Sequence, residues 1–151
     1  MSTAWDRSRL GSLALIAVIA LFGASCGGDD DSGGGGGSAK SVGVTLHDFE
    51  VTLDPSSAAA GSVDFDIHND GPSTHEFVIF KTDLAPEDLP LNSDGDVDEE
   101  GDGVQHVDEV EDIEANADAS LTADLDAGKY VLICNLPGHY KAGMHAQLTV
   151  E

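Results

Sequence analysis

The chain has 151 residues, which is room for one domain and little else. Its 29 acidic and 6 basic side chains give a formal net charge of -23. This charge argues against a nucleic-acid partner, because phosphate binding requires a basic surface, and it favours a basic or neutral docking partner.

The first 25 residues are predicted to be an export signal. Arg7 and Arg9 precede an apolar run over residues 10–22, and small residues follow that run. A basic start, a short apolar core and a small-residue end are typical of such signals. The run of 13 residues is too short to span a bilayer comfortably, since a spanning helix needs about 20 residues.

Residues 21–26 read LFGASC, which resembles a bacterial lipobox. In that motif a peptidase cleaves before the cysteine, which then carries lipid. We therefore expect residues 1–25 to be a lipoprotein signal peptide and Cys26 to anchor the protein to the outer, extracytoplasmic face of the cell membrane. Gly23 stands where lipoproteins usually have a leucine-like residue, so a plain signal peptide with Cys26 as a free thiol is the alternative.

Residues 26–40 are predicted to be a flexible linker after the lipidated cysteine. Residues 27–38 consist of seven glycines, three aspartates and two serines, which cannot bury a core. A random coil of this length reaches about 20 Å. The folded domain is therefore expected to span residues 41–151, held near the membrane through the lipid alone.

Period-2 alternation of apolar and polar residues recurs from residue 42 onward and predicts an all-β fold. Turn signals such as Asp54-Pro55 and the segment 69–72 separate the runs, and residues 130–133 are apolar throughout, as in a central strand covered on both faces. Short strands at this spacing favour a sandwich or barrel without a long amphipathic helix. The expected inward positions are Val42, Val44, Leu46, Phe49, Val51, Leu53, Val63, Phe65, Ile67, Leu121, Ala123, Leu125, Ala146, Leu148 and Val150.

An acidic insertion interrupts this pattern around residues 92–118. Residues 94–114 contain 11 acids and no base, which predicts a solvated, mobile excursion. A calcium loop is the alternative, because Asp94, Asp96 and Asp98 fit the first three ligand positions of an EF-hand. Glu99 stands where that loop needs glycine, and Gln105 stands where it needs a bidentate glutamate.

The chemistry is expected in residues 134–144, where Cys134, His139 and Met144 follow one another at five-residue intervals. Met144 shares its strand parity with the apolar positions of the last strand, so it points into the core. A thiolate, imidazoles and one weak thioether form the ligand set of an electron-transfer copper site. Such a site needs a second histidine, and His75 is the best candidate, since it opens an apolar strand with the parity of Phe77.

These residues resemble the cupredoxins, with a histidine after an Asn-x-Gly turn and then Cys, His and Met in one loop. The resemblance covers residues 41–151, and the loop spacing is most similar to that of rusticyanin, sulfocyanin and auracyanin. It implies a Greek-key β-sandwich or barrel of roughly seven to eight strands. It also implies one copper ion in a type 1 (blue) site, with His75, Cys134 and His139 in a trigonal plane and Met144 as the axial ligand. Glu76 departs from the family pattern, in which Asn or Ser usually follows the first histidine.

The predicted function is that of a monomeric one-electron carrier that serves unidentified redox partner proteins. A non-redox copper protein for scavenging, storage or delivery uses the same ligands and remains the alternative; a zinc site also remains open, although zinc gains little from an axial methionine. An enzyme is not expected, because the chain has neither a His-x-His pair nor a Gly-x-Ser-x-Gly elbow. The ring edge of His139 is expected to lie at an apolar patch formed with Leu136, Pro137, Tyr140 and Ala142. The remaining histidines are expected to be exposed: His47, His68, His106 and His145.

Cys134 has two possible states in an exported protein. Metal ligation would protect its thiolate from oxidation, and a disulfide with Cys26 is the competing possibility.

Overall fold

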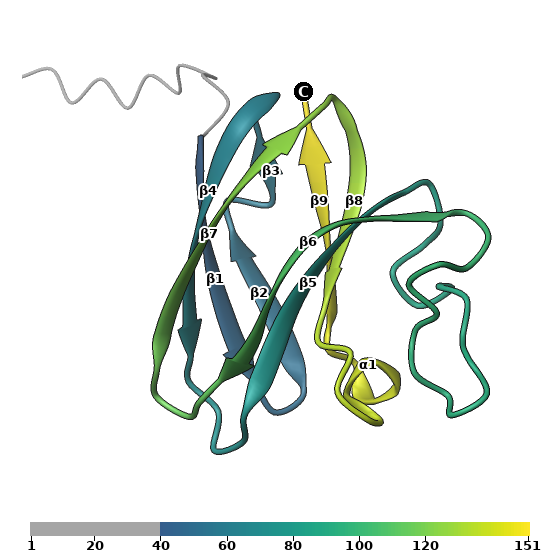
Figure 1. Cartoon of the computed structure of the whole chain (residues 1–151). Helices are drawn as coiled ribbons and strands as arrows, with labels where there is room; N and C mark the ends of the chain where they lie inside the picture. Colours follow the sequence, from purple (N-terminus) through teal and green to yellow (C-terminus); the bar gives the residue numbers. More distant parts are fainter. Residues whose placement is uncertain (1–39) are drawn as a thin grey trace, which may run out of the picture. The chain divides into compact units, whose positions relative to one another are not determined.

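In the computed structural model, the segments with alternating apolar and polar residues form strands that pair into two β-sheets (Figure 1). The structure describes residues 40–151. The predicted signal peptide, the predicted lipidation of Cys26 and nearly all of the predicted linker lie outside the described residues. The first sheet has the strand order β2 (Glu50–Asp54), β1 (Ser41–His47), β4 (Gly61–Asn69) and β7 (Asp118–Leu125). Strand β1 runs parallel to β4, and the other two pairs are antiparallel.

The second sheet carries the segments in which chemistry was expected. Its order is β3 (Ser57–Ala58), β9 (His145–Val150), β8 (Gly128–Ile133), β5 (His75–Thr82) and β6 (Val104–Ile113). A short helix, α1 (His139–Ala142), lies between β8 and β9. The expected all-β fold is confirmed, and the described residues contain nine strands rather than seven to eight.

The core between the two sheets consists of the side chains that alternation predicted to point inward. Val42, Val44, Leu46, Val63, Phe65 and Ile67 are all at most 2% exposed. Phe49 is an exception, because it lies in the turn before β2 rather than in the strand and is 46% exposed.

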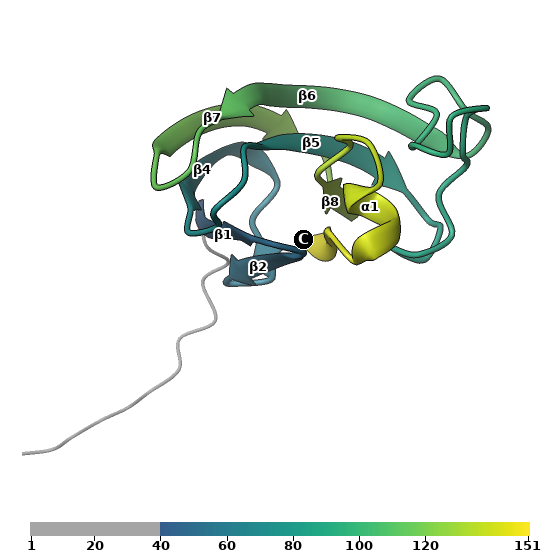
Figure 2. The ribbon, with the colours of Figure 1, turned by 90° about the horizontal axis from the view of Figure 1, so that it is seen from below.

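Strand β8 is covered on both faces, as its continuous apolar run predicted. Tyr130 and Leu132 face the core between the sheets, whereas Val131 and Ile133 belong to a second buried cluster on the outer face. Leu89 and Val97, from the loop between β5 and β6, close that second cluster. Figure 2 shows this loop beside α1, at one side of the β5–β8 sheet.

The acidic segment is more ordered than its composition predicted. Residues 104–113 form β6, which pairs antiparallel with β5 along its length, so the expectation of a mobile excursion is wrong for this part. The strand forms because Val107, Val110 and Ile113 pack against the core while the acidic side chains stay at the solvent. Ahead of it, the backbone N–H groups of Asp94, Gly95 and Asp96 donate to Oδ1 of Asn92 and shape a turn.

Within residues 40–151, no helix has the length and apolar character that crossing a membrane requires.

Candidate metal centre

The four predicted ligand residues come from two segments at one end of the domain, the start of β5 and the loop between β8 and β9. His75 opens β5, Cys134 follows β8, His139 opens α1 and Met144 directly precedes β9. The loop is closed by its own backbone: Cys134 N–H donates to the carbonyl of Met144 at 3.1 Å, and Met144 N–H donates to the carbonyl of His139 at 3.1 Å. Figure 2, viewed from below, shows α1 and the end of β8 beside β5.

Three donor atoms form a small triangle. The Nδ1 atoms of His75 and His139 are 3.2 Å apart. Cys134 Sγ lies 3.8 Å from Nδ1 of His75 and 3.3 Å from Nδ1 of His139. Among the described residues, these three side chains form one of two groups whose ligand atoms all lie within 4.8 Å of one another.

This triangle fits a single transition-metal ion. Metal–nitrogen bonds of about 2.0 Å and metal–sulfur bonds of about 2.3 Å, set at about 120° in a plane, separate the donor atoms by about 3.5–3.7 Å. The three measured separations of 3.2, 3.3 and 3.8 Å bracket that range. Small rotations of the side chains would bring all three donors to bonding distance.

Three of the four predicted ligand residues are fully buried. His75, Cys134 and Met144 are each 0% exposed, and Cys134 and Met144 belong to the same core cluster, as strand parity predicted for Met144. Within residues 40–151 Cys134 is a buried free thiol, and Cys26, its possible disulfide partner, lies outside the described residues. A thioether buried next to a thiol and two imidazoles provides the soft ligand set that copper accepts.

Burial favours the uncharged forms of Cys134 and His139 in the absence of a metal. Burial raises the pKa of the Cys134 thiol above its ordinary value. Burial also lowers the pKa of His139, and the neighbouring His75 lowers it further. The site therefore holds a protonated thiol and a neutral imidazole, and binding a cation would release the thiol proton.

Glu76 affects the cysteine through its backbone rather than its side chain. Its N–H points to Cys134 Sγ at 3.4 Å, a contact that any residue at this position could make. Its half-buried carboxyl has a pKa of about 7, raised first by burial and then by the charges of Glu99, Glu109 and Glu111. The departure from the family pattern at this position thus leaves the contact with sulfur in place.

The turn between β1 and β2 contacts both histidines, and sequence reasoning missed it. Asp48 Oδ1 accepts a hydrogen bond from Nε2 of His75 at 2.9 Å, while Asp48 Oδ2 accepts one from the Ser73 hydroxyl at 2.7 Å. The Ser73 hydrogen bond is the main reason that the pKa of Asp48 lies below its ordinary value. Phe49 packs edge-on against His139, with ring centroids 5.0 Å apart. No local pattern marks these residues, because their partners lie 25 or more positions away.

Asn69 fixes the segment that leads into His75. Its side chain is 0% exposed; Nδ2 donates to the carbonyls of Ser73 and Ile113, both at 2.8 Å, and Oδ1 accepts from Gly71 N–H at 2.9 Å. The sequence identified this residue only as part of a turn.

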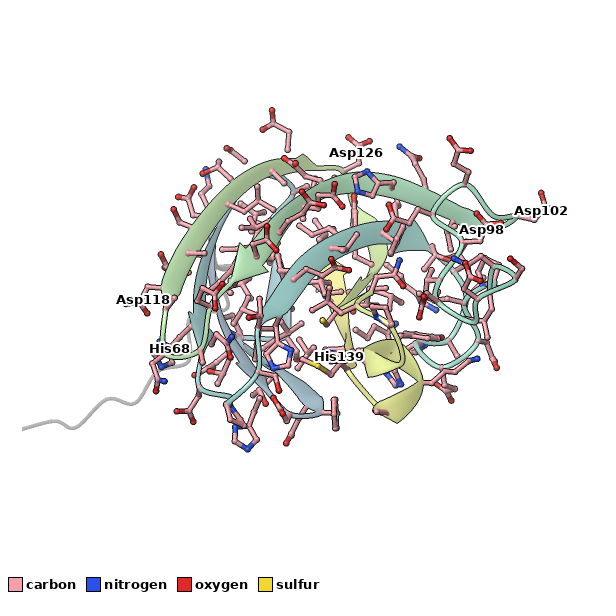
Figure 3. All side chains as sticks on the ribbon, turned by 60° about the horizontal axis from the view of Figure 1, so that its bottom comes forward. His68, Asp98, Asp102, Asp118, Asp126 and His139 are labelled. Atoms are coloured by element: carbon pink, nitrogen blue, oxygen red, sulfur yellow. The ribbon has the colours of Figure 1, made fainter. Side chains whose placement is uncertain are left out.

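The apolar surroundings of His139 differ from the expected set. Tyr140 is turned inward, where its hydroxyl donates to the carbonyl of Pro86 at 2.8 Å and accepts from Leu89 N–H at 3.0 Å. Exposed Phe49 takes its place beside the ring. Figure 3 shows His139 at the centre of this end of the domain, whereas the labelled aspartates lie toward the periphery.

The four remaining histidines do not join the centre. His68 Nδ1 lies 2.7 Å from a carboxylate oxygen of Asp118, and His106 Nε2 lies 3.5 and 3.9 Å from those of Glu109 and Glu99. The latter group is the second cluster with metal-compatible spacing among the described residues, and at least a third of each of its side chains is exposed. Three of the four are exposed, as expected: His47, His68 and His106, although the ring of His106 packs on Phe80. His145 departs from the expectation, because it is half-buried against Tyr140.

Comparison with known protein families assigns the chain to a family. Residues 53–151 match the model of the sulfocyanin (SoxE) domain. The chain belongs to the sulfocyanin domain family. It is thus a cupredoxin, and the expected resemblance is confirmed. No protein in the curated set of sequences matches the chain.

Solved cupredoxin structures superimpose on the domain at low sequence identity. Reduced auracyanin from Roseiflexus castenholzii has a TM-score of 0.56 at 16% identity, over 76% of this chain and 99% of that one. Auracyanin A from Chloroflexus aurantiacus has a TM-score of 0.51 at 18% identity, over 74% and 98%. Rusticyanin from Thiobacillus ferrooxidans has a TM-score of 0.54 at 19% identity, over 76% and 79%. At these identities the structures support the shared fold alone.

Proposed function

We propose that this cupredoxin binds one copper ion and carries single electrons. His75, Cys134 and His139 would form the trigonal plane, and Met144 would be the weak axial ligand. The observation that carries the proposal is the donor triangle with sides of 3.2, 3.3 and 3.8 Å. A His₂Cys plane with a long axial methionine is the ligand set of blue electron-transfer sites.

The chain's own residues keep the ligands in place. The bound ion would supply the change between the cuprous and cupric states. The backbone hydrogen bonds of the loop between Cys134 and Met144 hold the donors in one arrangement, so little has to move when an electron is transferred. His139 is the only one of the four proposed ligands with solvent exposure, and its ring edge beside Phe49 is the proposed path to a redox partner.

The proposed location is the outer face of the cell membrane. Support comes from the basic and apolar pattern of residues 1–25, from the lipobox-like sequence before Cys26 and from the glycine-rich linker. In this proposal the protein is an electron carrier and not an enzyme, and its partners are proteins with a basic or neutral docking surface.

The ligand assignment is tested by the visible and EPR spectra of the copper-loaded protein. The wild type should show an intense blue thiolate-to-copper band, and Cys134→Ala and His139→Ala should lose it. His145→Ala is the matched control, because this neighbouring histidine lies outside the donor triangle and should leave the band intact. A copper-loaded Cys134→Ala protein that kept the blue band would overturn the assignment.

The carrier role is tested separately, by voltammetry of the same copper-loaded protein. A carrier should give a reversible one-electron wave with fast electron exchange. Slow or irreversible exchange with an intact blue band would favour the alternative of copper storage or delivery.

A further inference from the structure

The side chain of Asp48 lies behind His75, on the side away from the donor triangle. The imidazole of His75 has two nitrogens; Nδ1 faces Cys134 and His139, while Nε2 lies 2.9 Å from Asp48 Oδ1. The His75 side chain is 0% exposed and that of Asp48 is 20% exposed, so water competes little for this contact. A carboxylate can only accept a hydrogen bond, so Nε2 of His75 carries a proton in this contact.

The carboxylate of Asp48 is itself held from its other side. The Ser73 hydroxyl donates to Oδ2 at 2.7 Å, which leaves Oδ1 directed at the ring. Gly71 packs against the same contact: a Cβ added there would lie 2.7 Å from Asp48 Oδ1 and 2.9 Å from His75 Nε2. Any larger residue at position 71 would therefore separate the pair, and the glycine is required for the two side chains to meet.

We propose that Asp48 is a positioning residue for the metal centre, one that holds His75 with Nδ1 free to bind and that favours the cupric state through its negative charge. The inference rests on the proposed copper site and deepens it. A histidine that donates its second N–H to a carboxylate has a fixed tautomer and ring orientation and is a more basic ligand. A negative charge near the ion stabilises Cu(II) more than Cu(I), because the Coulomb energy grows with the charge of the ion.

The expected size of the effect follows from comparable contacts behind metal ligands. Their loss lowers metal affinity by about 10- to 100-fold. The loss should fall mainly on Cu(II), and each tenfold difference between the two oxidation states raises the reduction potential by about 59 mV. Asp48 thus lowers the potential of this centre.

The experiment compares three variants of the purified full chain. Asp48→Asn keeps a side-chain oxygen for His75 Nε2 but removes the charge, and Asp48→Ala removes both. Asp70→Asn is the matched control: it also removes one negative charge, from the neighbouring turn between β4 and β5, and among the described contacts its carboxylate has none with His75. Copper affinities and reduction potentials are measured on the loaded proteins, and the His75 tautomer is read from nitrogen-15 NMR of the metal-free proteins.

The proposal predicts a clear order of results. Asp48→Asn should weaken Cu(II) binding at least tenfold and raise the potential well beyond the shift of Asp70→Asn, while His75 stays in the Nε2–H form. Asp48→Ala should in addition populate the Nδ1–H form. Equal potentials for Asp48→Asn and Asp70→Asn, or an unchanged tautomer in Asp48→Ala, would overturn the proposal. The tautomer is measured without metal, so this result stands even where the wild type shows no blue band, which would count against the proposed function alone.

Discussion

Replacing Glu76 with glutamine tests whether the acidic surface beside the centre weakens the fold at neutral pH. The carboxyl of Glu76 is half-buried, and burial together with Glu99, Glu109 and Glu111 raises its pKa from the ordinary value of 4.5 to about 7. Folding therefore favours the protonated form of this group. Glutamine has the same shape and carries no charge at any pH.

The size and sign of the effect follow from the shift. Below pH 4.5 the group is mostly protonated in both folded and unfolded chains and has little effect on stability. Between pH 4.5 and about 7 the unfolded chain has lost this proton while the folded protein retains it, so the destabilisation grows across this range and is complete above pH 7. The difference between a pKa of 4.5 in the unfolded chain and about 7 in the folded protein corresponds to at most about 3.4 kcal/mol of unfolding free energy. Solvent screens part of this in a half-exposed carboxylate, so we expect about 1–2 kcal/mol.

The assay is denaturant unfolding of the metal-free, reduced protein at pH 4 and pH 8. Glu76→Gln should match the wild type at pH 4 and exceed its free energy of unfolding by about 1–2 kcal/mol at pH 8. Glu50→Gln, which removes an exposed charge from the other sheet, is the control and should show no such gap. A difference between Glu76→Gln and wild type that does not change with pH would refute the reasoning.

Two further substitutions test the frame around the centre. Asn69→Ala leaves the carbonyls of Ser73 and Ile113 and the N–H of Gly71 without partners, so the free energy of unfolding should fall by about 2–4 kcal/mol in denaturant titrations; a loss below about 0.5 kcal/mol would contradict the role given to this side chain. Met144→Leu conserves volume in the core and should cost less than about 1.5 kcal/mol. Because it removes the proposed axial thioether, it should raise the reduction potential of the copper-loaded protein in voltammetry, and an unchanged potential would count against Met144 as a ligand.

Much of the centre could be predicted from short stretches of sequence. The five-residue spacing from Cys134 to His139 to Met144 lies within one loop, so local chain geometry already confines the three residues. Parity along β9 placed Met144 in the core, and it is 0% exposed. His75 could be assigned because an Asn-x-Gly turn and an apolar strand frame it.

The acidic segment shows where composition fails as a guide. Eleven acids over residues 94–114 predicted a mobile excursion, yet β6 forms in this segment, because Val107, Val110 and Ile113 find apolar partners on the core. An edge strand needs only one apolar face, and a few such residues among many acids are a weak signal in the sequence.

The sequence by itself determined most of the strands, though not β3 or β6, together with their core faces and the residues that could bind a metal, because these depend on alternation and spacing between near neighbours. Only the tertiary structure decided which side chains contact the two histidines from outside the donor triangle. Asp48 meets His75 because the parallel pairing of β1 with β4 brings the β1–β2 turn beside the turn that leads into β5. Phe49 meets His139 because the packing of the two sheets brings the same turn against the loop between β8 and β9. Such contacts join residues that are far apart in the chain and share no sequence motif, so no periodicity in the sequence predicts them.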